Sequence, residues 1–372
     1  MPPFLFSSCG RALFVLLLVL VSGVVRADKL DDNLQTVWES LWDQRGTPRS
    51  LVRWDKPLTY SIGGYDFERH RPHIQKAMRD AAQATQLDIT EVSTDAASNE
   101  TAMLTFEVVR NDVLDDSMPC LTVSKWTNGV LTSAVVRMQS KSAWGCTFHE
   151  VMHAMGIAGH PSGRSVLSYF PYRRDEFMAL DQLMLKAWYD PSMPKNATPL
   201  EALVVLTQAV ASQTDLAISP DQAAERTRLF NLNIVEQVKA LALGKGEVPT
   251  IVQRSGRASM AHIQAARPLA AYHVAQAYLR GTTVTRDVAA SSKWFEISAR
   301  QGYSAGQAMW GRALARGDGV AVDLLAAHGW LSLATKSNNS FARTELDALE
   351  KSMPAEQLDV ARLAPAPVLS PP

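Results

Sequence analysis

Hydrophobic positions in the first half of the chain follow two spacings, one typical of helices and the other typical of strands. Residues 28–44 and 69–85 carry apolar side chains three and four positions apart, which predicts two amphipathic helices. Runs rich in β-branched and aromatic residues predict strands at 51–62, 87–92, 102–109, 119–126 and 131–138. Asn128-Gly129 between the last two strands is typical of a hairpin turn, and a further helix is expected from about residue 145. The sequence therefore predicts an α+β domain with a twisted mixed sheet.

The second half of the chain has only helical spacing, with predicted helices at 202–211 and 221–243. From about residue 265 the sequence repeats with an offset of 36 residues. The matching pairs are Gly281 and Gly317, Val284 and Val320, Asp287 and Asp323, and Trp294 and Trp330. A period of this length predicts pairs of helices that stack as a solenoid.

These glycines, and the aspartates and tryptophans that follow them, resemble the Sel-one-like subtype of tetratricopeptide-type repeats. The resemblance implies an all-α helical-repeat (solenoid) domain at 261–363 that presents a concave surface to a protein partner. Residues 339–363 are expected to add a closing helical pair, and the proline-rich tail at 364–372 is expected to be disordered. The alternative is that so short an array only supports the first domain.

Composition and charge limit the classes of partner and compartment. The 372 residues suit two domains, and 47% of them are hydrophobic, which is enough for buried cores. Basic and acidic residues number 37 each, so the net charge of zero argues against nucleic acid or an anionic membrane as a partner. Residues 1–27 combine Arg11, an apolar run at 12–21 and a final Ala27, as a secretory signal does. The run is too short for a stable membrane anchor, so we expect a secreted or periplasmic protein.

The candidate chemistry lies between residues 149 and 160. His149 and His153 are four residues apart, so on a helix their imidazoles share one face and can hold one Zn²⁺ ion. Glu150 points away from the helix face that carries the two histidines, and it can accept a proton from a zinc-bound water. Gly156 is expected to end the helix, because glycine adopts the left-handed conformation of helix ends. His160 can then return towards the metal as a third ligand.

The motif that begins at His149 resembles that of the metzincin clan of zinc metallopeptidases, whose pattern continues with a third histidine and a turn carrying a methionine. In this chain His160 stands one residue late, and Leu167 replaces the methionine. The resemblance implies that Leu167 packs beneath the metal and that Tyr169 stabilises the oxyanion. It also implies that a peptide substrate adds as an extra strand along 119–126, at the sheet edge above the metal. The combination of a metzincin-like core with the Tyr189-Asp190-Pro191 ending of a later helix also resembles an exported bacterial family known as a domain of unknown function.

Three points stay open at the level of sequence. Removal of the signal peptide leaves Cys120 and Cys146, an even count that predicts a disulfide, although Cys146 could instead lie near the metal as a thiolate. The predicted helix at 28–44 could be a packing element over the fold, or residues 28–49 could be a latency segment. If His160 does not reach the metal, a carboxylate of the predicted helix at 174–189 could replace it, from Asp175, Glu176 or Asp181.

Together these features predict a metzincin-like zinc peptidase domain at 28–195, a helical linking region at 196–260 and helical repeats at 261–363. The predicted function is an exported zinc-dependent endopeptidase that hydrolyses a peptide or protein substrate, while the repeats bind a protein partner. One alternative is a non-catalytic scaffold of the cell envelope with a structural or vestigial zinc site. Another is a metallohydrolase that acts on a non-protein bond of the envelope.

Overall fold

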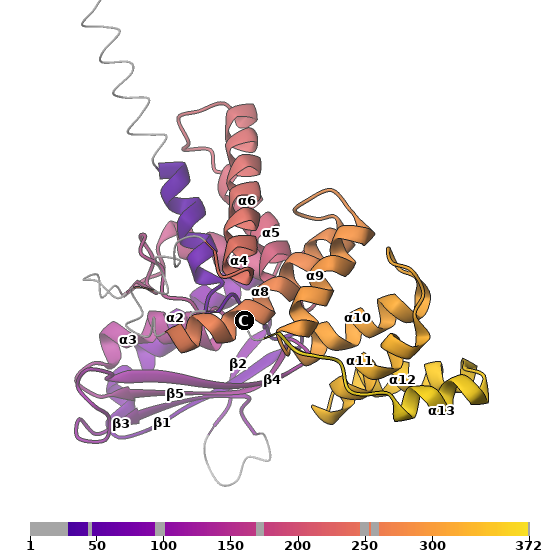
Figure 1. Cartoon of the computed structure of the whole chain (residues 1–372). Helices are drawn as coiled ribbons and strands as arrows, with labels where there is room; N and C mark the ends of the chain where they lie inside the picture. Colours follow the sequence, from indigo (N-terminus) through magenta and orange to yellow (C-terminus); the bar gives the residue numbers. More distant parts are fainter. Residues whose placement is uncertain are drawn as a thin grey trace, which may run out of the picture.

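The computed structural model of the chain describes residues 29–43, 47–93, 101–168, 175–245, 253 and 260–370. The predicted signal peptide at 1–27 lies outside these ranges. Figure 1 shows a sheet with helices above it, followed by an array of helices that extends to one side. None of the helices in the described ranges has the length and apolar character that a membrane crossing requires.

The sheet of the described residues has five strands in the order β2-β1-β3-β5-β4. Its strands are β1 (Leu58–Gly64), β2 (Ile89–Glu91), β3 (Leu104–Val109), β4 (Cys120–Thr127) and β5 (Val130–Gln139). The first four in the spatial order are parallel to one another, and β4 is antiparallel to β5 at the edge. Alternate side chains of β3, namely Leu104, Phe106 and Val108, are buried, so one face of the sheet carries the core. The predicted mixed sheet is confirmed.

The predicted strand at 51–62 is wrong at both ends. β1 begins only at Leu58, because Pro57 before it has no N–H group to donate to a neighbouring strand. The strand then continues through Gly64, where φ is 99° and an added Cβ would stand 2.2 Å from the Val108 carbonyl oxygen. Glycine at this position therefore lets β1 stay close to β3.

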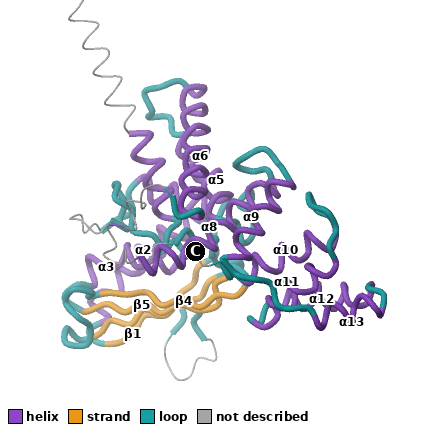
Figure 2. Tube along the Cα trace, viewed as in Figure 1, coloured by secondary structure: helices purple, strands orange, loops and turns teal. Residues whose placement is uncertain are grey.

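Helices pack on the core side of the sheet. A helix at 29–40 is followed by α2 (Phe67–Thr85), α3 (Ala143–Ala154) and α4 (Ala179–Trp188). α3 contacts β4 and β5, and Figure 2 shows α2 and α3 on the same side of the strands. The helix predicted at 174–189 begins late, at Ala179. The reason is that the Asp181 carboxylate accepts from the Met178 N–H at 2.9 Å and so caps the first turn there.

The remaining helices of the described residues form the second half of the molecule. They are α5 (Pro199–Ala211), α6 (Pro220–Ala242), α8 (Met260–Arg280), α9 (Val288–Arg300), α10 (Ser304–Arg316), α11 (Leu324–Lys336), α12 (Ser340–Ser352) and α13 (Ala355–Leu363). Gly281 and Gly317 follow α8 and α10 with φ values of 71° and 74°. Asp287 and Asp323 cap α9 and α11 by accepting from backbone N–H groups. The repeated residues therefore end one helix and begin the next in each pair, and the predicted helical-repeat region is confirmed.

Two hydrophobic cores hold these elements, and they do not divide the chain at the expected boundary near residue 195. The first core runs from Leu30 to Ala277 and contains side chains of the sheet, α3, α5, α6 and α8. The second core runs from Ala275 to Ala361. α5 joins the first core through fully buried side chains, which are Leu200, Leu203, Leu206 and Val210. The described helices of the predicted linking region therefore share the core of the sheet domain.

The structure corrects the expectation of a disordered tail at 364–372. Residues 364–370 have no helix or strand but lie against the repeats, where the Ser370 N–H donates to the Arg300 carbonyl oxygen at 2.8 Å. Pro367 lies against Gly329 of α11, where an added Cβ would stand 3.3 Å from the proline ring. Because prolines reduce the freedom of the unbound segment, a few contacts are enough to hold it on the repeats.

His273 of α8 connects the two halves of the molecule. The residue is 1% exposed, and its Nε2 donates to the Pro48 carbonyl oxygen at 3.2 Å. Burial lowers the pKa of His273 from its ordinary 6.5 to about 4. The folded protein therefore keeps this ring neutral at pH values at which the unfolded chain is protonated.

Acidification is expected to destabilise the fold through His273. Its contribution is complete above pH 6.5 and is lost as the pH falls towards 4, since the unfolded chain takes up a proton that the folded chain excludes. Between pH 7 and pH 5 the loss in unfolding free energy is about 2 kcal/mol. Denaturant unfolding of wild type and His273→Gln at both pH values measures it, with the exposed His262→Gln as control. An effect of His273→Gln that is equal at the two pH values contradicts this expectation.

Candidate metal centre

α3 positions the first two histidines of the site. His149 and His153 are four residues apart on this helix, and their ring centroids are 4.7 Å apart. The helix ends at Ala154, and Gly156 follows with φ of 101°, so its predicted role as the end of the helix is confirmed. An added Cβ at Gly156 would stand 2.0 Å from the Val52 carbonyl oxygen, so the chain can turn back here only with glycine.

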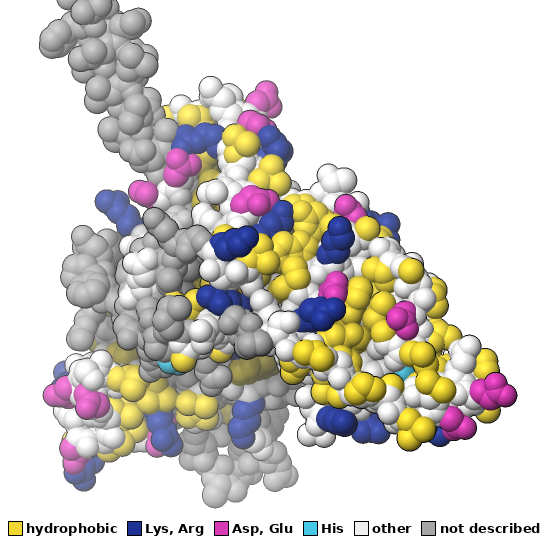
Figure 3. All heavy atoms as spheres, viewed as in Figure 1, with side chains coloured by type: hydrophobic (Ala, Val, Ile, Leu, Met, Phe, Trp, Pro, Cys, Tyr) yellow, Lys and Arg dark blue, Asp and Glu magenta, His cyan; other side chains and the backbone are white. Residues whose placement is uncertain are grey.

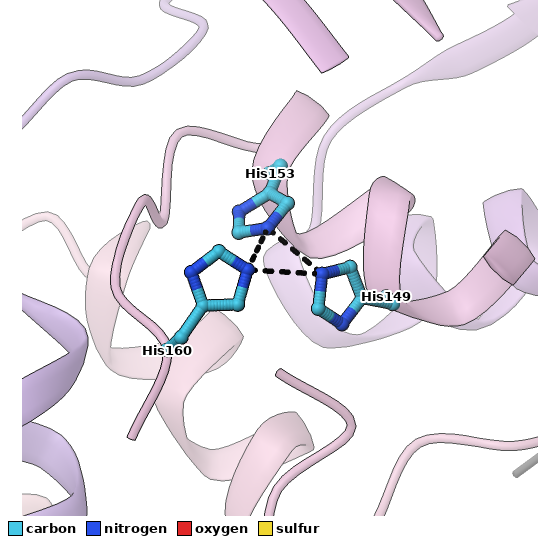
Figure 4. A group of neighbouring side chains, drawn as sticks. All are labelled: His149, His153 and His160. Atoms are coloured by element: carbon cyan, nitrogen blue, oxygen red, sulfur yellow. Dashed lines mark hydrogen bonds between the residues drawn. The ribbon is translucent and has the colours of Figure 1, made fainter. Parts of the chain in front are cut away.

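The returning chain brings His160 to the other two rings (Figure 4). The distance between Nε2 atoms is 3.0 Å for His149 and His153, 3.1 Å for His153 and His160, and 3.2 Å for His149 and His160. These atoms form one cluster of ligand-type nitrogens. The structure therefore places the predicted third histidine with the first two, in spite of its late position in the sequence.

Hydrogen bonds at the opposite ring nitrogens orient two of the rings. His149 Nδ1 donates to the Val166 carbonyl oxygen at 2.9 Å, and His153 Nδ1 donates to the Ile157 carbonyl oxygen at 2.7 Å. A neutral ring that donates from Nδ1 carries a lone pair at Nε2. The 3.0 Å contact between these two Nε2 atoms therefore sets one lone pair against the other. A cation between the rings would stabilise this arrangement, which is the usual way in which imidazole is oriented to bind metals.

The three rings are neutral well below neutral pH. Burial, with a smaller contribution from His153, lowers the pKa of His149 to about 4. Burial likewise lowers the pKa of His153 to about 4. The pKa of His160 is lowered by burial first and by the two other rings second. Because a metal ligand must be deprotonated, the rings are in the form that binds a metal ion at pH 7.

The size and donors of the cluster fit zinc. Nitrogen donors about 2.0–2.1 Å from a tetrahedral zinc ion stand about 3.3 Å from one another. The observed separations of 3.0–3.2 Å are close to that value. His160 is buried, whereas His149 and His153 are partly exposed, so solvent can reach part of the cluster. Three imidazoles, two of them on partly exposed residues, are a donor set typical of catalytic zinc sites.

Glu150 stands beside the cluster without belonging to it. Its Oε2 accepts a hydrogen bond from Thr122 Oγ1 of β4 at 2.6 Å. The residue is 2% exposed, and burial raises the pKa of its carboxyl against smaller opposing effects of His149 and Thr122. A buried carboxyl with a raised pKa that interacts with His149 is suited to take up a proton and return it.

A disulfide joins the edge strand to α3. Cys120 at the start of β4 is bonded to Cys146 on α3, with Cα atoms 6.2 Å apart. This agrees with the pairing predicted from the cysteine count, and the alternative of a Cys146 thiolate near the metal is wrong. The disulfide and the hydrogen bond between Thr122 and Glu150 hold β4 against successive turns of α3.

Reduction of this disulfide is expected to lower the free energy of unfolding by about 3 kcal/mol, the amount typical of a loop of this length. The two cysteines are 26 residues apart. Denaturant unfolding with and without reductant measures the difference. The double variant Cys120→Ala/Cys146→Ala is the control, because its unfolding should not respond to reductant. Equal midpoints for oxidised and reduced wild type contradict the expected stabilisation.

The turn at 165–167 supports His149 from behind. Val166, whose carbonyl oxygen accepts from His149, donates its own N–H to the Asp181 carboxylate at 3.1 Å. Ser165 Oγ donates to the same carboxylate at 2.6 Å. Asp181 is fully buried by these contacts, so it orients the turn and is not the replacement ligand considered from the sequence.

Of the other predicted site residues, the structure describes Asp175, Glu176 and Leu167 but not Tyr169. Asp175 and Glu176, the remaining replacement ligands, lie outside the histidine cluster found among the described residues. Leu167 is fully buried in the first core, as expected of a packing residue. Tyr169, the predicted oxyanion stabiliser, lies outside the described residues, and its role stays a prediction.

Comparison with known proteins identifies the repeats. No curated protein matches the chain. One similar solved structure is a protective antigen present in uropathogenic Escherichia coli strains, displaying an SLR fold. It is 23% identical over 49% of this chain and 36% of that chain, with a TM-score of 0.25. Another is a Sel1 repeat protein from Oxalobacter formigenes, 21% identical over 45% of this chain and 55% of that one, with a TM-score of 0.23.

The chain thus spans from about a third to about half of the length of these two structures. The metzincin-like character of the first domain stays a prediction. Residues 268–303 and 304–339 each match the Sel1 repeat family, so the predicted Sel-one-like repeats are confirmed.

Proposed function

We propose that this protein is an exported zinc-dependent endopeptidase, in which His149, His153 and His160 hold the metal and Glu150 is the general base. The observation that carries the proposal is the convergence of three neutral imidazoles through their Nε2 atoms beside a buried carboxylate. The residues of the cluster resemble the metzincin motif, which favours peptide hydrolysis over other zinc chemistry. His160 stands one residue later than in the metzincin motif. This does not weaken the proposal, because its Nε2 lies 3.1–3.2 Å from the Nε2 atoms of His149 and His153.

Each residue of the site has a separate task in this proposal. Zinc, when bound, supplies a Lewis acid and lowers the pKa of a water ligand to about 7. Glu150 takes a proton from the attacking water and returns it to the leaving amine, which the raised pKa of its carboxyl favours. Thr122 keeps the carboxylate in place through its hydrogen bond to Oε2. Asp181 and Val166 hold the ring of His149 in its orientation.

The edge strand gives the substrate a place to lie. β4 pairs with β5 alone among the strands of the described residues, so its outer side is available for a further strand. Thr122 belongs to this strand and contacts Glu150, so a peptide added along β4 would pass the metal site. Val123 is 56% exposed and Trp126 46% exposed, and these apolar side chains could contact such a peptide.

Metal analysis combined with a peptide library tests the proposal. One zinc ion per chain is expected, together with cleavage of part of a broad peptide library. A chelator should abolish the cleavage, and added zinc should restore it. Zinc binding without cleavage of any library member would reject the peptidase.

The second candidate is a non-catalytic scaffold of the cell envelope with a structural zinc site. The observation that favours it is the match to Sel1 repeats, which commonly mediate interactions between proteins. Figure 3 shows hydrophobic side chains among charged ones over the visible face of the repeat helices. The cobalt-substituted protein separates the two candidates. A hydroxamate should change its visible spectrum if a ligand position is open, and should have no effect at a structural site that protein ligands close.

A further inference from the structure

The loop that carries His160 lies directly on the helix at 29–40. The Gly159 N–H donates to the Ser40 carbonyl oxygen at 3.1 Å, and an added Cβ at Gly159 would stand 2.2 Å from the Glu39 carbonyl oxygen. At Gly163 an added Cβ would stand 1.8 Å from Thr36 Oγ1. The two glycines therefore let the loop lie against the helix on both sides of His160, Gly159 against the backbone and Gly163 against the Thr36 side chain.

Glu39 is the main polar contact between this helix and the loop. The residue is 1% exposed, and its Oε2 accepts from the Ser162 N–H at 2.5 Å and from Ser162 Oγ at 2.8 Å. Gln35 Nε2 donates to the other carboxylate oxygen at 3.0 Å. A buried carboxylate bonded in this way fixes the loop two residues after His160.

The other end of the helix is fixed as well. Lys29 forms an ion pair with Asp215 between α5 and α6, and Asn33 Nδ2 donates to Gln213 Oε1 at 3.2 Å. The apolar side of the helix belongs to the first core, with Leu30, Leu34, Val37 and Trp38 buried. Contacts with the first core and with the segment between α5 and α6 therefore hold this helix in place, and the helix in turn supports the loop.

We propose that Glu39 is a positioning residue for the third metal ligand, and that the helix at 29–40 is a permanent part of the metal site rather than a removable latency segment. The proposal rests on the proposed zinc site. The extra residue between Gly156 and His160 lengthens the connecting loop, and Gly159 accommodates it against the helix.

Glu39→Ala is expected to weaken zinc binding at least about 10-fold in chelator competition, the range seen for residues that support a ligand. The visible spectrum of the cobalt-substituted protein should change as well, because the ligand geometry is altered. Glu39→Gln keeps a side-chain oxygen that can accept from the Ser162 N–H, and should recover most of the affinity. Ser162→Ala removes only the hydroxyl donor to Glu39, at an exposed position, and should weaken binding by a smaller factor.

Glu201→Ala is the matched control. Glu201 is 3% exposed and accepts from Arg280 at 2.7 Å, so its loss removes a buried carboxylate far along the chain from the cluster. This variant should be less stable but should bind zinc like wild type. Wild-type zinc affinity in Glu39→Ala and Ser162→Ala overturns the positioning role, and raised peptidase activity in Glu39→Ala would show a latency segment instead. A wild type that binds no zinc rejects the metal site itself.

Discussion

Glu150→Gln is expected to lower the rate of peptide hydrolysis by about 10²–10⁴-fold while zinc stays bound at the wild-type ratio. The amide has almost the same size as the carboxylate, and Thr122 Oγ1 can still donate to its oxygen. It cannot take up a proton at neutral pH, so the general base is lost while the imidazole cluster is unchanged. Measurements of kcat/KM on a library-derived substrate, together with zinc content, test both parts.

Two variants control this experiment. Glu176→Gln removes a carboxylate that lies outside the histidine cluster, and should leave both rate and metal content unchanged. Thr122→Val removes only the hydrogen bond that holds Glu150, so a smaller loss of rate is expected with zinc retained. Equal cleavage by Glu150→Gln and wild type would mean that another group activates the water.

The sequence predicts those parts of the molecule that depend on local spacing. The alternation of apolar positions in β3 and the four-residue spacing of His149 and His153 are both properties of a single element. The glycines and aspartates of the repeats act within one turn of a helix end, so their roles could also be predicted from the sequence. For the same reason, the end of α3 at Gly156 agrees with the prediction.

Element ends and supporting contacts depend on residues that are distant in the chain. The start of α4 is set by Asp181, whose carboxylate also holds the turn behind His149. The sequence around Asp181 predicts neither of these two contacts. Thr122 looks like any threonine of an edge strand until β4 is placed next to α3. Glu39 and Ser162 are 123 residues apart, and no local pattern relates them.

The late position of His160 shows why its role could not be settled from spacing. A motif counts residues along the chain, whereas a ligand is placed by the path of the loop in space. Here the additional residue is taken up where Gly159 lies against the backbone of Glu39 and Ser40. Such a close approach needs glycine on one side and a correctly placed helix on the other, and only the first of these can be seen in the sequence.

His160→Ala is expected to weaken zinc binding at least about 100-fold, because it removes one of three nitrogen donors, a larger change than the loss of a supporting residue. In chelator competition this is a shift of about 2.7 kcal/mol in binding free energy. His73→Ala is the control, since it removes a buried histidine that stacks on Trp144 and lies outside the cluster. Zinc affinity equal to that of wild type in His160→Ala would mean that another group is the third ligand.

Thermal stability gives an independent measurement of the same ligand. Zinc that binds the folded chain alone stabilises it in proportion to the logarithm of its affinity, so at saturating zinc the variant should gain about 2.7 kcal/mol less than wild type. Without zinc the difference in stability between wild type and His160→Ala should be smaller, because the variant then loses no bond to the metal. A difference in stability between wild type and variant that does not depend on zinc would instead assign His160 a packing role.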